Sequence, residues 1–193
     1  WDFEGPNVKW FAGGKLNITE NCLDRHLKQR GNKLAIIWEP NDPQERFIRL
    51  TYRELHEKVC QYANVLKRNG AKKGDRICIY MPMVPELVIA TLACARIGAI
   101  HSVVFCGFSA QSLSDRIQDA QANIVLTSDG LNRGHKQIPV KRVVDEALEN
   151  CPSVLKVIVT ERLGWAVNMV EGRDVWLHEE LKHVDKHCPA EVM

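Results

Sequence analysis

The chain has 193 residues, 45% of them hydrophobic and 26% charged, with a formal net charge of +2 at pH 7. This composition is typical of a single globular domain and excludes disordered and fibrous classes. The small net charge gives no indication of a nucleic-acid or membrane partner. The seven cysteines lie mostly inside apolar runs without a C-x-x-C pair, so we expect neither a zinc site nor a disulfide framework.

The chain also lacks the marks of export. It contains no apolar run of about 18 residues, and its first residues have no apolar signal core. These features favour a cytoplasmic or matrix enzyme over a secreted or membrane protein, and we predict a cytoplasmic location. The chain begins without a methionine and ends without a closing element, so we interpret it as a fragment of a longer protein.

Residues 1–15 are aromatic and glycine-bearing and show no period. They predict an extended segment, neither helix nor strand, that lies over a surface, while residues 16–193 predict an α/β subdomain. The aromatic side chains of this segment that would need cover are Trp1, Phe3, Trp10 and Phe11.

A capping box of Asn17 and Glu20 predicts a helix that ends at Gly31. The side chains that it would bury are Ile18, Cys22, Leu23 and Leu27.

The apolar runs 34–38 and 47–50 are separated by a loop rich in proline, asparagine and aspartate, which predicts an antiparallel hairpin. Thr51 and Glu54 form a second capping box, and the helix that they begin ends at Gly70.

Residues 76–133 have the pattern strand, helix, strand, helix, strand, loop. The first helix starts at Pro85 and stops at Gly98, and Ser109 caps the second. The predicted strands are 77–80, 100–105 and 123–127. Their continuous apolar runs are typical of parallel strands with both faces covered.

After this stretch the sequence predicts a helix over 140–148, a strand over 154–159, a short strand over 166–169 and a capped helix from Asp174 to about Lys182. The whole pattern predicts an α/β fold: a mostly parallel sheet flanked by helices, with an antiparallel hairpin near the N-terminus. Apolar sheet surface left uncovered in a fragment would favour self-association.

Two strand ends carry a candidate ligand site. The turn Cys106-Gly107-Phe108 follows one strand, and a loop with Arg133 and Lys136 follows the next. Ligands of open α/β sheets bind at the carboxyl ends of the strands, so we expect the glycine turn and the basic loop to lie side by side on neighbouring strands. From these residues alone, a solvated basic loop and a merely structural turn remain open alternatives.

Five stretches carry a resemblance to a known family: NCLDRHL at 21–27, LAIIWE at 34–39, KKGDRICIYMPMVPE at 72–86, ACARIGAIHSVVF at 93–105 and EGRD at 171–174. They resemble the AMP-forming acetyl-CoA synthetases of the adenylate-forming superfamily, and the similarity covers essentially the whole chain. The resemblance implies the N-terminal part of the large N-terminal domain of such an enzyme. The family's phosphate loop, acetate pocket and C-terminal domain with the catalytic lysine would lie beyond Met193.

The resemblance also implies a reaction. Such an enzyme is an acetate-CoA ligase that converts acetate, ATP and CoA to acetyl-CoA, AMP and pyrophosphate through acetyl-AMP, with Mg bound to ATP. This segment would supply the CoA nucleotide-binding surface and would be catalytically incomplete alone. The implied partners are these small molecules, and no residue of the chain is assigned as catalytic or metal-binding.

The residues that the resemblance implies for the CoA nucleotide are Phe105, Cys106, Gly107, Arg133, Lys136 and Ile138. Phe105 to Gly107 would lie beside the adenine, and Arg133 would contact a phosphate with Ile138 alongside. Two positions depart from the family. Cys106 replaces a glycine, and Lys136 replaces an arginine, which keeps the charge but loses the bidentate fork.

Three alternatives remain at this point. The parent protein could be a propionyl-CoA synthetase of the same family. A nucleotide-binding module of Rossmann type is a second possibility, although no G-x-G-x-x-G opens a helix. A structural half-domain without catalysis is the third.

Overall fold

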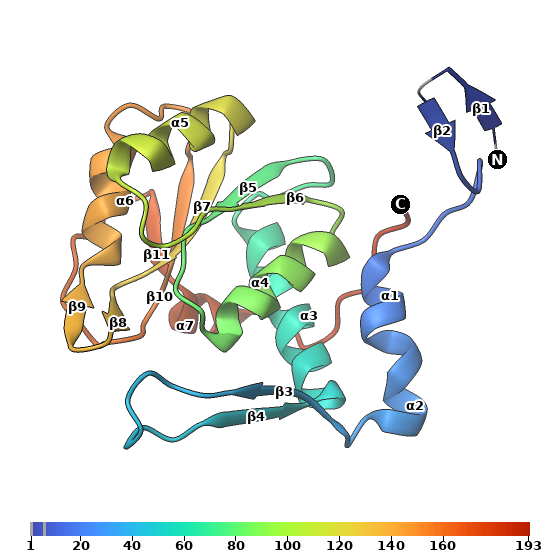
Figure 1. Cartoon of the computed structure of the whole chain (residues 1–193), viewed down its shortest axis with the longest axis horizontal. Coiled ribbons are helices and arrows are strands. Elements are labelled where there is room, and N and C mark those ends of the chain that lie inside the picture. Colours follow the sequence, from blue (N-terminus) through green and yellow to red (C-terminus); the bar gives the residue numbers. More distant parts are fainter. Residues whose placement is uncertain (1, 6) are drawn as a thin grey trace.

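A computed structural model describes residues 2–5 and 7–193 of the chain. Its centre is a parallel sheet with the strand order β11-β10-β7-β5-β6 (Figure 1). The strands are β5 (Arg76–Ile79), β6 (Ile100–Val103), β7 (Ile124–Ser128), β10 (Lys156–Thr160) and β11 (Asp174–Trp176). The predicted α/β fold with a mostly parallel sheet is therefore confirmed.

Helices cover both faces of this sheet. The helices α3 (Tyr52–Arg68) and α4 (Pro85–Arg96) pack in one apolar layer, together with Leu177 at the start of α7 (Leu177–Glu180). The helices α5 (Ala110–Ala120) and α6 (Val140–Leu148) form the other layer. The two pairs lie on opposite sides of the sheet in Figure 1.

Strand β5 shows why two layers are needed. Ile77 and Ile79 point into the layer of α3 and α4, while Cys78 and Tyr80, on the alternate positions, point into the layer of α5 and α6. All four side chains are buried. This confirms the prediction of a parallel strand with both faces covered.

Strand β6 lies at the edge of the sheet, next to β5 alone. Its Ile100 is 56% exposed and its Val103 is 51% exposed. An edge strand presents unpaired backbone groups as well as side chains. The chain therefore displays the apolar sheet edge from which we expected self-association.

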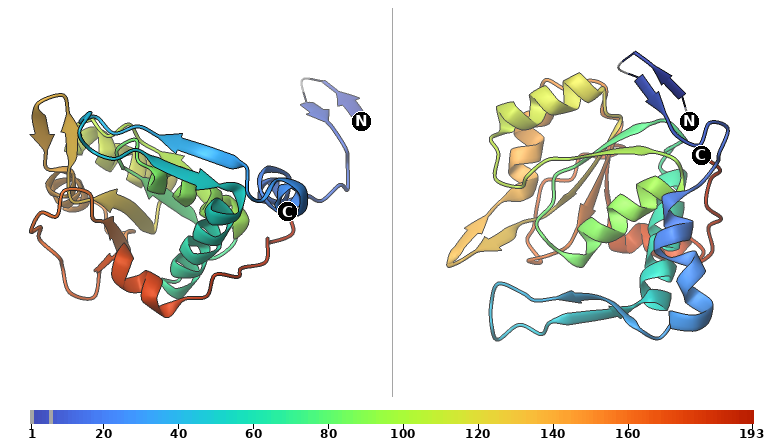
Figure 2. Two further views of the ribbon diagram at one scale, coloured as in Figure 1. Left: turned by 90° about the horizontal axis from the view of Figure 1, so that it is seen from below. Right: turned by 45° about the vertical axis from the view of Figure 1, so that its right-hand side comes forward.

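The N-terminal segment differs from its prediction. It contains an antiparallel hairpin of β1 (Asp2–Glu4) and β2 (Asn7–Lys9), which extends away from the body of the molecule (Figures 1 and 2). The expectation of a strandless segment was wrong because strands of three residues are too short to show a period. Phe11 is 86% exposed, so it is not laid over a surface. Trp1 and the side chain of Phe3 lie outside the described residues.

The predicted helix up to Gly31 is divided into α1 (Ile18–Cys22), η1 (Asp24–His26) and α2 (Leu27–Arg30). Asn17 does cap it, because its Oδ1 accepts from Thr19 N at 2.9 Å. Leu23 is buried, but Ile18 is 54% exposed and Cys22 is also exposed, contrary to the prediction. The buried face carries polar groups instead.

That polar face is held by hydrogen bonds to distant segments. The Asn17 amide donates to Ala95 O at 2.9 Å and to Glu191 O at 2.9 Å. An apolar periodicity could not show this, since only Leu23 of the four predicted apolar side chains is fully buried and the polar Asn17 is buried through hydrogen bonds.

The predicted hairpin near the N-terminus is confirmed as β3 (Leu34–Trp38) and β4 (Ile48–Thr51), which pair antiparallel. The capping box is confirmed as well. Thr51 Oγ1 accepts from Glu54 N at 3.3 Å and Glu54 Oε2 accepts from Thr51 N at 2.8 Å. Gly70, with φ +93°, follows α3 in the left-handed region that favours glycine.

The C-terminal third departs from its prediction in two places. Residues 166–169 form no strand, and the predicted helix from Asp174 begins instead with strand β11, followed by α7 and η2 (Leu181–His183). A buried ion pair explains the strand: Lys141 Nζ lies 2.8 Å from Asp174 Oδ2, and Arg173 also bonds this carboxylate. These bonds hold β11 against α6, so tertiary contacts override the local capping signal.

Arg96, the last residue of α4, joins this helix to two remote segments. Its guanidinium makes two bonds to the Asp24 carboxylate, at 2.8 and 2.9 Å, and its Nε donates to Cys188 O. Burial alone would raise the pKa of Asp24, but the hydrogen bonds and charge of Arg96 hold that pKa below its usual value. Arg96 itself is 2% exposed.

We expect Arg96→Ala to lower the free energy of unfolding by about 3 kcal/mol, because the Asp24 carboxylate and the Cys188 carbonyl lose the charged donor that bonds both of them. Urea unfolding measures this change. Arg68→Ala is the matched control, because Arg68 pairs with Glu180 at 3.3 Å from an exposed position and should cost no more than about 0.5 kcal/mol. Equal losses in the two variants would show that Arg96 is not a structural tie.

Candidate functional site

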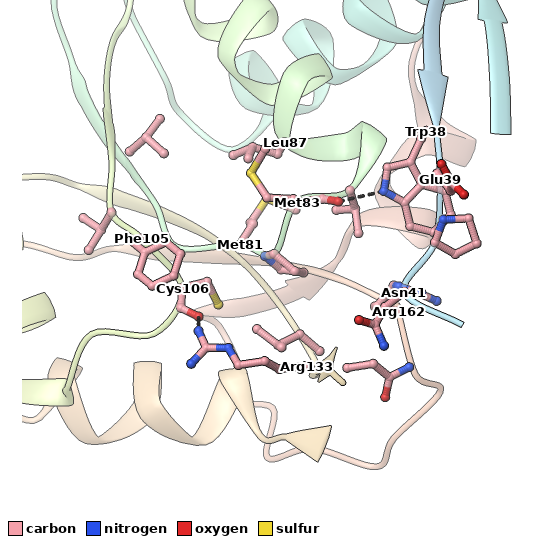
Figure 3. Close-up of a pocket in the computed structure, with 17 residues that line it drawn as sticks. Trp38, Glu39, Asn41, Met81, Met83, Leu87, Phe105, Cys106, Arg133 and Arg162 are labelled. Atoms are coloured by element: carbon pink, nitrogen blue, oxygen red, sulfur yellow. Dashed lines mark hydrogen bonds between the residues drawn. The ribbon is translucent and has the colours of Figure 1, made fainter. Parts of the chain in front are cut away.

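A cleft of about 620 Å³ opens at the carboxyl ends of the strands (Figure 3). Its walls are segments at or soon after the ends of strands: 38–41 at the end of β3, 81–84 after β5, 103–106 at the end of β6, and 131–133 after β7. Leu87 and Arg162 complete the lining. This is the place where open α/β sheets bind their ligands.

The turn after β6 is held by its own backbone and by Tyr80. Gly107 N donates to Phe105 O at 2.7 Å, and Tyr80 Oη donates to Phe108 O at 2.8 Å. Burial, followed by the neighbouring Cys106, raises the pKa of Tyr80 to about 12, so its hydroxyl keeps the proton that it donates. The turn is thus fastened to Tyr80, the buried residue directly after β5.

Phe105 stands at the open side of this turn. This residue is 62% exposed, and its ring meets Phe108 edge to face, with 5.9 Å between the ring centroids. Phe105 is therefore an exposed aromatic surface and not a core residue.

Cys106 is buried beneath Phe105, and burial raises the pKa of its thiol to about 12, against a smaller opposing effect of Arg133. A thiol that keeps its proton at neutral pH is a poor nucleophile. Cys106 contributes its backbone carbonyl to the site.

Arg133 reaches this turn from the other side of the cleft. Its Nη2 donates to Cys106 O at 3.3 Å, and its guanidinium carbon lies 5.6 Å from the centre of the Phe105 ring. Figure 3 shows the guanidinium below the Phe105 ring with this bond drawn. The expected meeting of the glycine turn and the basic segment therefore occurs.

Gly107 has a spatial role in this meeting. A Cβ at this position would lie 2.5 Å from Arg133 Nη2 and 2.7 Å from Phe105 Cε1. Any larger residue would displace the guanidinium or the ring. Gly107 does not line the cleft itself, but it makes room for Arg133.

The geometry corrects two details of the prediction. Strands β6 and β7 are not neighbours, because β5 lies between them, so Arg133 reaches across the end of β5. The basic segment is also not a loop but a hairpin of β8 (Leu131–Arg133) and β9 (Lys136–Ile138). Its three-residue strands are too short for a periodic pattern.

Lys136 and Ile138 hold secondary positions. Lys136 is the cross-strand partner of Arg133 and is exposed, while Ile138 is partly buried and packs against the layer of α5 and α6. Neither lines the cleft. Opposite residues of an antiparallel pair point to the same face, so Lys136 adds positive charge beside Arg133.

Asp129 organises the segments behind the cleft, a role that the sequence analysis missed. Its carboxylate is fully buried and accepts four backbone N–H groups, from Gly130, Arg162, Leu163 and Trp165, at 2.8 to 3.2 Å. The available signal was an aspartate before a glycine at a strand end, because such residues bond nearby backbone. Asp129 therefore joins the ends of β7 and β10.

The β3–β4 hairpin closes the cleft from a third side, which the sequence analysis also missed. Trp38 Nε1 donates to Met83 O at 2.7 Å, and the guanidinium carbon of Arg162 lies 5.2 Å from the centre of the Trp38 ring. Arg162 Nη2 also pairs with Glu45 Oε2 at 2.7 Å. These contacts join segments remote in sequence, which no local pattern announces.

Other kinds of site find no support in the part of the chain that the structure describes. It contains no group of three or more His, Cys, Asp or Glu side chains able to hold a metal ion. Its helices are all too short or too polar to cross a membrane. All seven cysteines are free thiols.

A parallel sheet with an apolar cleft, an exposed aromatic ring and a positioned guanidinium at its strand ends defines an open α/β protein with its cleft at the usual ligand position of such sheets. The profile of the AMP-binding enzyme family matches residues 23–192, and the chain belongs to this family.

Among its relatives, the acetyl-coenzyme A synthetase 2 of Pseudomonas aeruginosa is 54% identical over 192 residues, which are 100% of this chain and 30% of the relative. The acetyl-coenzyme A synthetase of Alkalilimnicola ehrlichii is 52% identical over 190 residues, or 98% of this chain and 29% of the relative. The chain thus spans about 30% of these relatives.

Among solved structures, the acetoacetyl-CoA synthetase from Streptomyces lividans superposes with a TM-score of 0.86 at 28% sequence identity. The match covers 97% of this chain and 28% of that chain. Nearly the whole of this chain therefore has the fold of the matching part of that larger synthetase.

We expect Asp129→Ala to destabilise the protein by about 3 to 5 kcal/mol, because four buried N–H groups lose their acceptor. Asp129→Asn should cost less, about 1 to 2 kcal/mol, since its amide oxygen still accepts. Urea unfolding gives both values. Asp115→Ala, which removes a carboxylate from the surface of α5, is the control and should change stability by no more than about 0.5 kcal/mol. A loss at Asp129 as small as at Asp115 would contradict its organising role.

Proposed function

We propose that this chain is the N-terminal part of the large domain of an acetate-CoA ligase, and that it binds the nucleotide of CoA. The parent enzyme would convert acetate, ATP and CoA to acetyl-CoA, AMP and pyrophosphate through acetyl-AMP. The observation that carries the proposal is the position of Arg133, whose guanidinium bonds the Cys106 carbonyl and lies 5.6 Å from the centre of the Phe105 ring in an apolar cleft.

The chemistry of CoA matches this arrangement. Its adenine offers a flat π-face to an exposed aromatic ring such as Phe105, and stacking of this kind contributes about 1 to 3 kcal/mol per base. Its phosphates suit a planar guanidinium, which forms charge-assisted hydrogen bonds. The space beside Gly107 lets the base, the ring and the guanidinium meet closely.

Within this proposal the remaining site residues support the same ligand. Lys136 adds a second positive charge on the face of the hairpin that carries Arg133, and Ile138 anchors that hairpin against the core. Lys136 should contribute less than Arg133, because an exposed ammonium is strongly hydrated and has no planar fork.

These residues do not carry the bond-making step. We propose that acetyl-AMP forms on Mg-bound ATP through the phosphate loop and the catalytic lysine of the longer protein, so the 193 residues alone are inactive. The preference for acetate over propionate rests on the names of the relatives. Buried free thiols also support a cytoplasmic location, because such thiols persist in reducing compartments.

Arg133→Ala should weaken CoA binding by roughly 10- to 150-fold, since it removes a charge-assisted hydrogen bond of about 1.5 to 3 kcal/mol. The two half-reactions of an acetyl-CoA synthetase that carries this sequence provide the measurement. Acetate-dependent pyrophosphate exchange does not need CoA and should hardly change, while the Michaelis constant for CoA in thioester formation should rise.

Lys136→Ala should have an effect of the same sign and smaller size. Arg142→Ala serves as a charge-matched control, because Arg142 lies on α6 and does not line the cleft. The proposal is wrong if Arg133→Ala lowers both half-reactions equally or leaves the Michaelis constant for CoA unchanged. If the full-length protein that carries this sequence binds CoA normally but shows no acetate-dependent pyrophosphate exchange, a nucleotide-binding module without catalysis is favoured instead.

We also propose that the isolated 193-residue chain associates with itself through the β6 edge, where Ile100 and Val103 are exposed. Sedimentation velocity should show concentration-dependent dimers or larger species, because an apolar strand edge can pair with a second copy. Val103→Lys, which places a charge on that edge, should shift the protein toward monomer. A chain that stays monomeric at every concentration would contradict the proposal.

A further inference from the structure

Asn41, in the loop between β3 and β4, makes a two-point contact with the tip of the β8–β9 hairpin. Its Nδ2 donates to Gly134 O at 3.0 Å, and Gly134 N donates to its Oδ1 at 3.3 Å. A side-chain amide that bonds both backbone groups of one residue imitates a rung of a β-ladder. The contact joins positions 93 residues apart in the sequence.

The ladder of the β8–β9 hairpin is too short to hold the tip firmly by itself. Its strands have three residues each, and a two-stranded hairpin is marginally stable in water. Gly134 and His135 form the exposed turn, and Gly134 has φ +58°, as the first position of a type II′ turn requires. The base of the hairpin is fixed better, since Leu131 is buried.

The residues next to this tip are the charged residues of the site. Arg133 directly precedes Gly134, and Lys136 is paired with Arg133 across the hairpin. A shift of the tip would therefore move the Arg133 guanidinium away from Cys106 O and from the Phe105 ring. Near a ligand, a displacement of about 1 Å is enough to lose a large part of a directional bond.

The loop that carries Asn41 is itself anchored. Glu45, four residues further on, pairs with Arg162 at 2.7 Å, and Arg162 also lies against Trp38 at the end of β3. Asn41, Arg162 and Arg133 line the same cleft (Figure 3). The Gly134 peptide is thus held by a loop that Arg162 fastens to the body of the molecule through two contacts.

We propose that Asn41 is a positioning residue for the CoA nucleotide site: it holds the Gly134 peptide and so keeps Arg133 and Lys136 where they meet the phosphates. The inference rests on the proposed function. Asn41 does not need to touch CoA, and it acts through the hairpin.

The first test is Asn41→Ala in an acetyl-CoA synthetase that carries this sequence. With both hydrogen bonds lost, kcat/KM for CoA in thioester formation should fall by about 3- to 10-fold, while acetate-dependent pyrophosphate exchange stays unchanged. Gln44→Ala is the matched control, because Gln44 lies in the same exposed loop and bonds Asp42 through its backbone N–H. An unchanged kcat/KM for CoA, or an equal loss in both half-reactions, overturns the inference.

The second test asks whether Asn41 acts through Arg133. In an Arg133→Ala background, adding Asn41→Ala should lower kcat/KM for CoA by less than about 2-fold, because residues that act through one contact are not additive. A purely structural role would give the same fold-change in both backgrounds. Additive effects would therefore overturn the inference.

Hydrogen–deuterium exchange without CoA separates this inference from the function on which it rests. Amides of residues 131–138 should exchange faster in Asn41→Ala than in the wild type or in Gln44→Ala. Unchanged exchange shows that the clamp does not hold the hairpin, and overturns the inference whatever the hairpin binds. Faster exchange with no effect of Arg133→Ala on CoA shows that the clamp exists but the CoA assignment is wrong, and the proposed role of Asn41 falls with it.

Discussion

The burial of both faces of β5 and β7 is the constraint on which the rest of the structure depends. Their side chains alternate between two apolar layers, so helices must cover each face. Because the strands are parallel, each connection must return from the carboxyl end of one strand to the amino end of the next. All the central strands then end at the same side of the molecule. The cleft, the Phe105 turn and the Arg133 hairpin lie together there because the strands that carry them run in one direction.

At that side, polar side chains hold backbone more than they hold one another. Asp129 binds four N–H groups, Tyr80 binds the Phe108 carbonyl, and Asn41 binds the Gly134 peptide. Each of these bonds fixes a loop or a turn that lies outside the central sheet. Arg133 is positioned by the segments so held, with one hydrogen bond to Cys106 O and the Phe105 ring centre 5.6 Å from its guanidinium carbon. Such preorganisation lowers the ordering cost that a ligand would otherwise meet.

The family relation, and the chain's coverage of only part of its relatives, agree with a protein in which this chain contributes some of the site and other segments contribute the rest. The relatives are synthetases of which the chain spans about 30%, and burial raises the pKa of Cys106, the thiol that lines the described cleft, to about 12. In the proposed function, adenylation and thioester formation use different groups of the longer protein. A defect at the Arg133 hairpin can therefore be assigned to one half-reaction, which makes the surface unusually accessible to mutational analysis.

The sequence by itself determined the elements whose signals are local. The capping box of Thr51 and Glu54, the cap at Ser109 and the apolar runs of β5, β7 and β10 each involve residues a few positions apart, and all were predicted. The resemblance pointed to Arg133 and the Phe105 turn, which the structure brings together. Tertiary structure alone decided that β5 separates β6 from β7, that β11 joins the sheet, and that Asn41 meets Gly134. These features depend on contacts between segments far apart in the chain, and such contacts leave no period or spacing in the sequence.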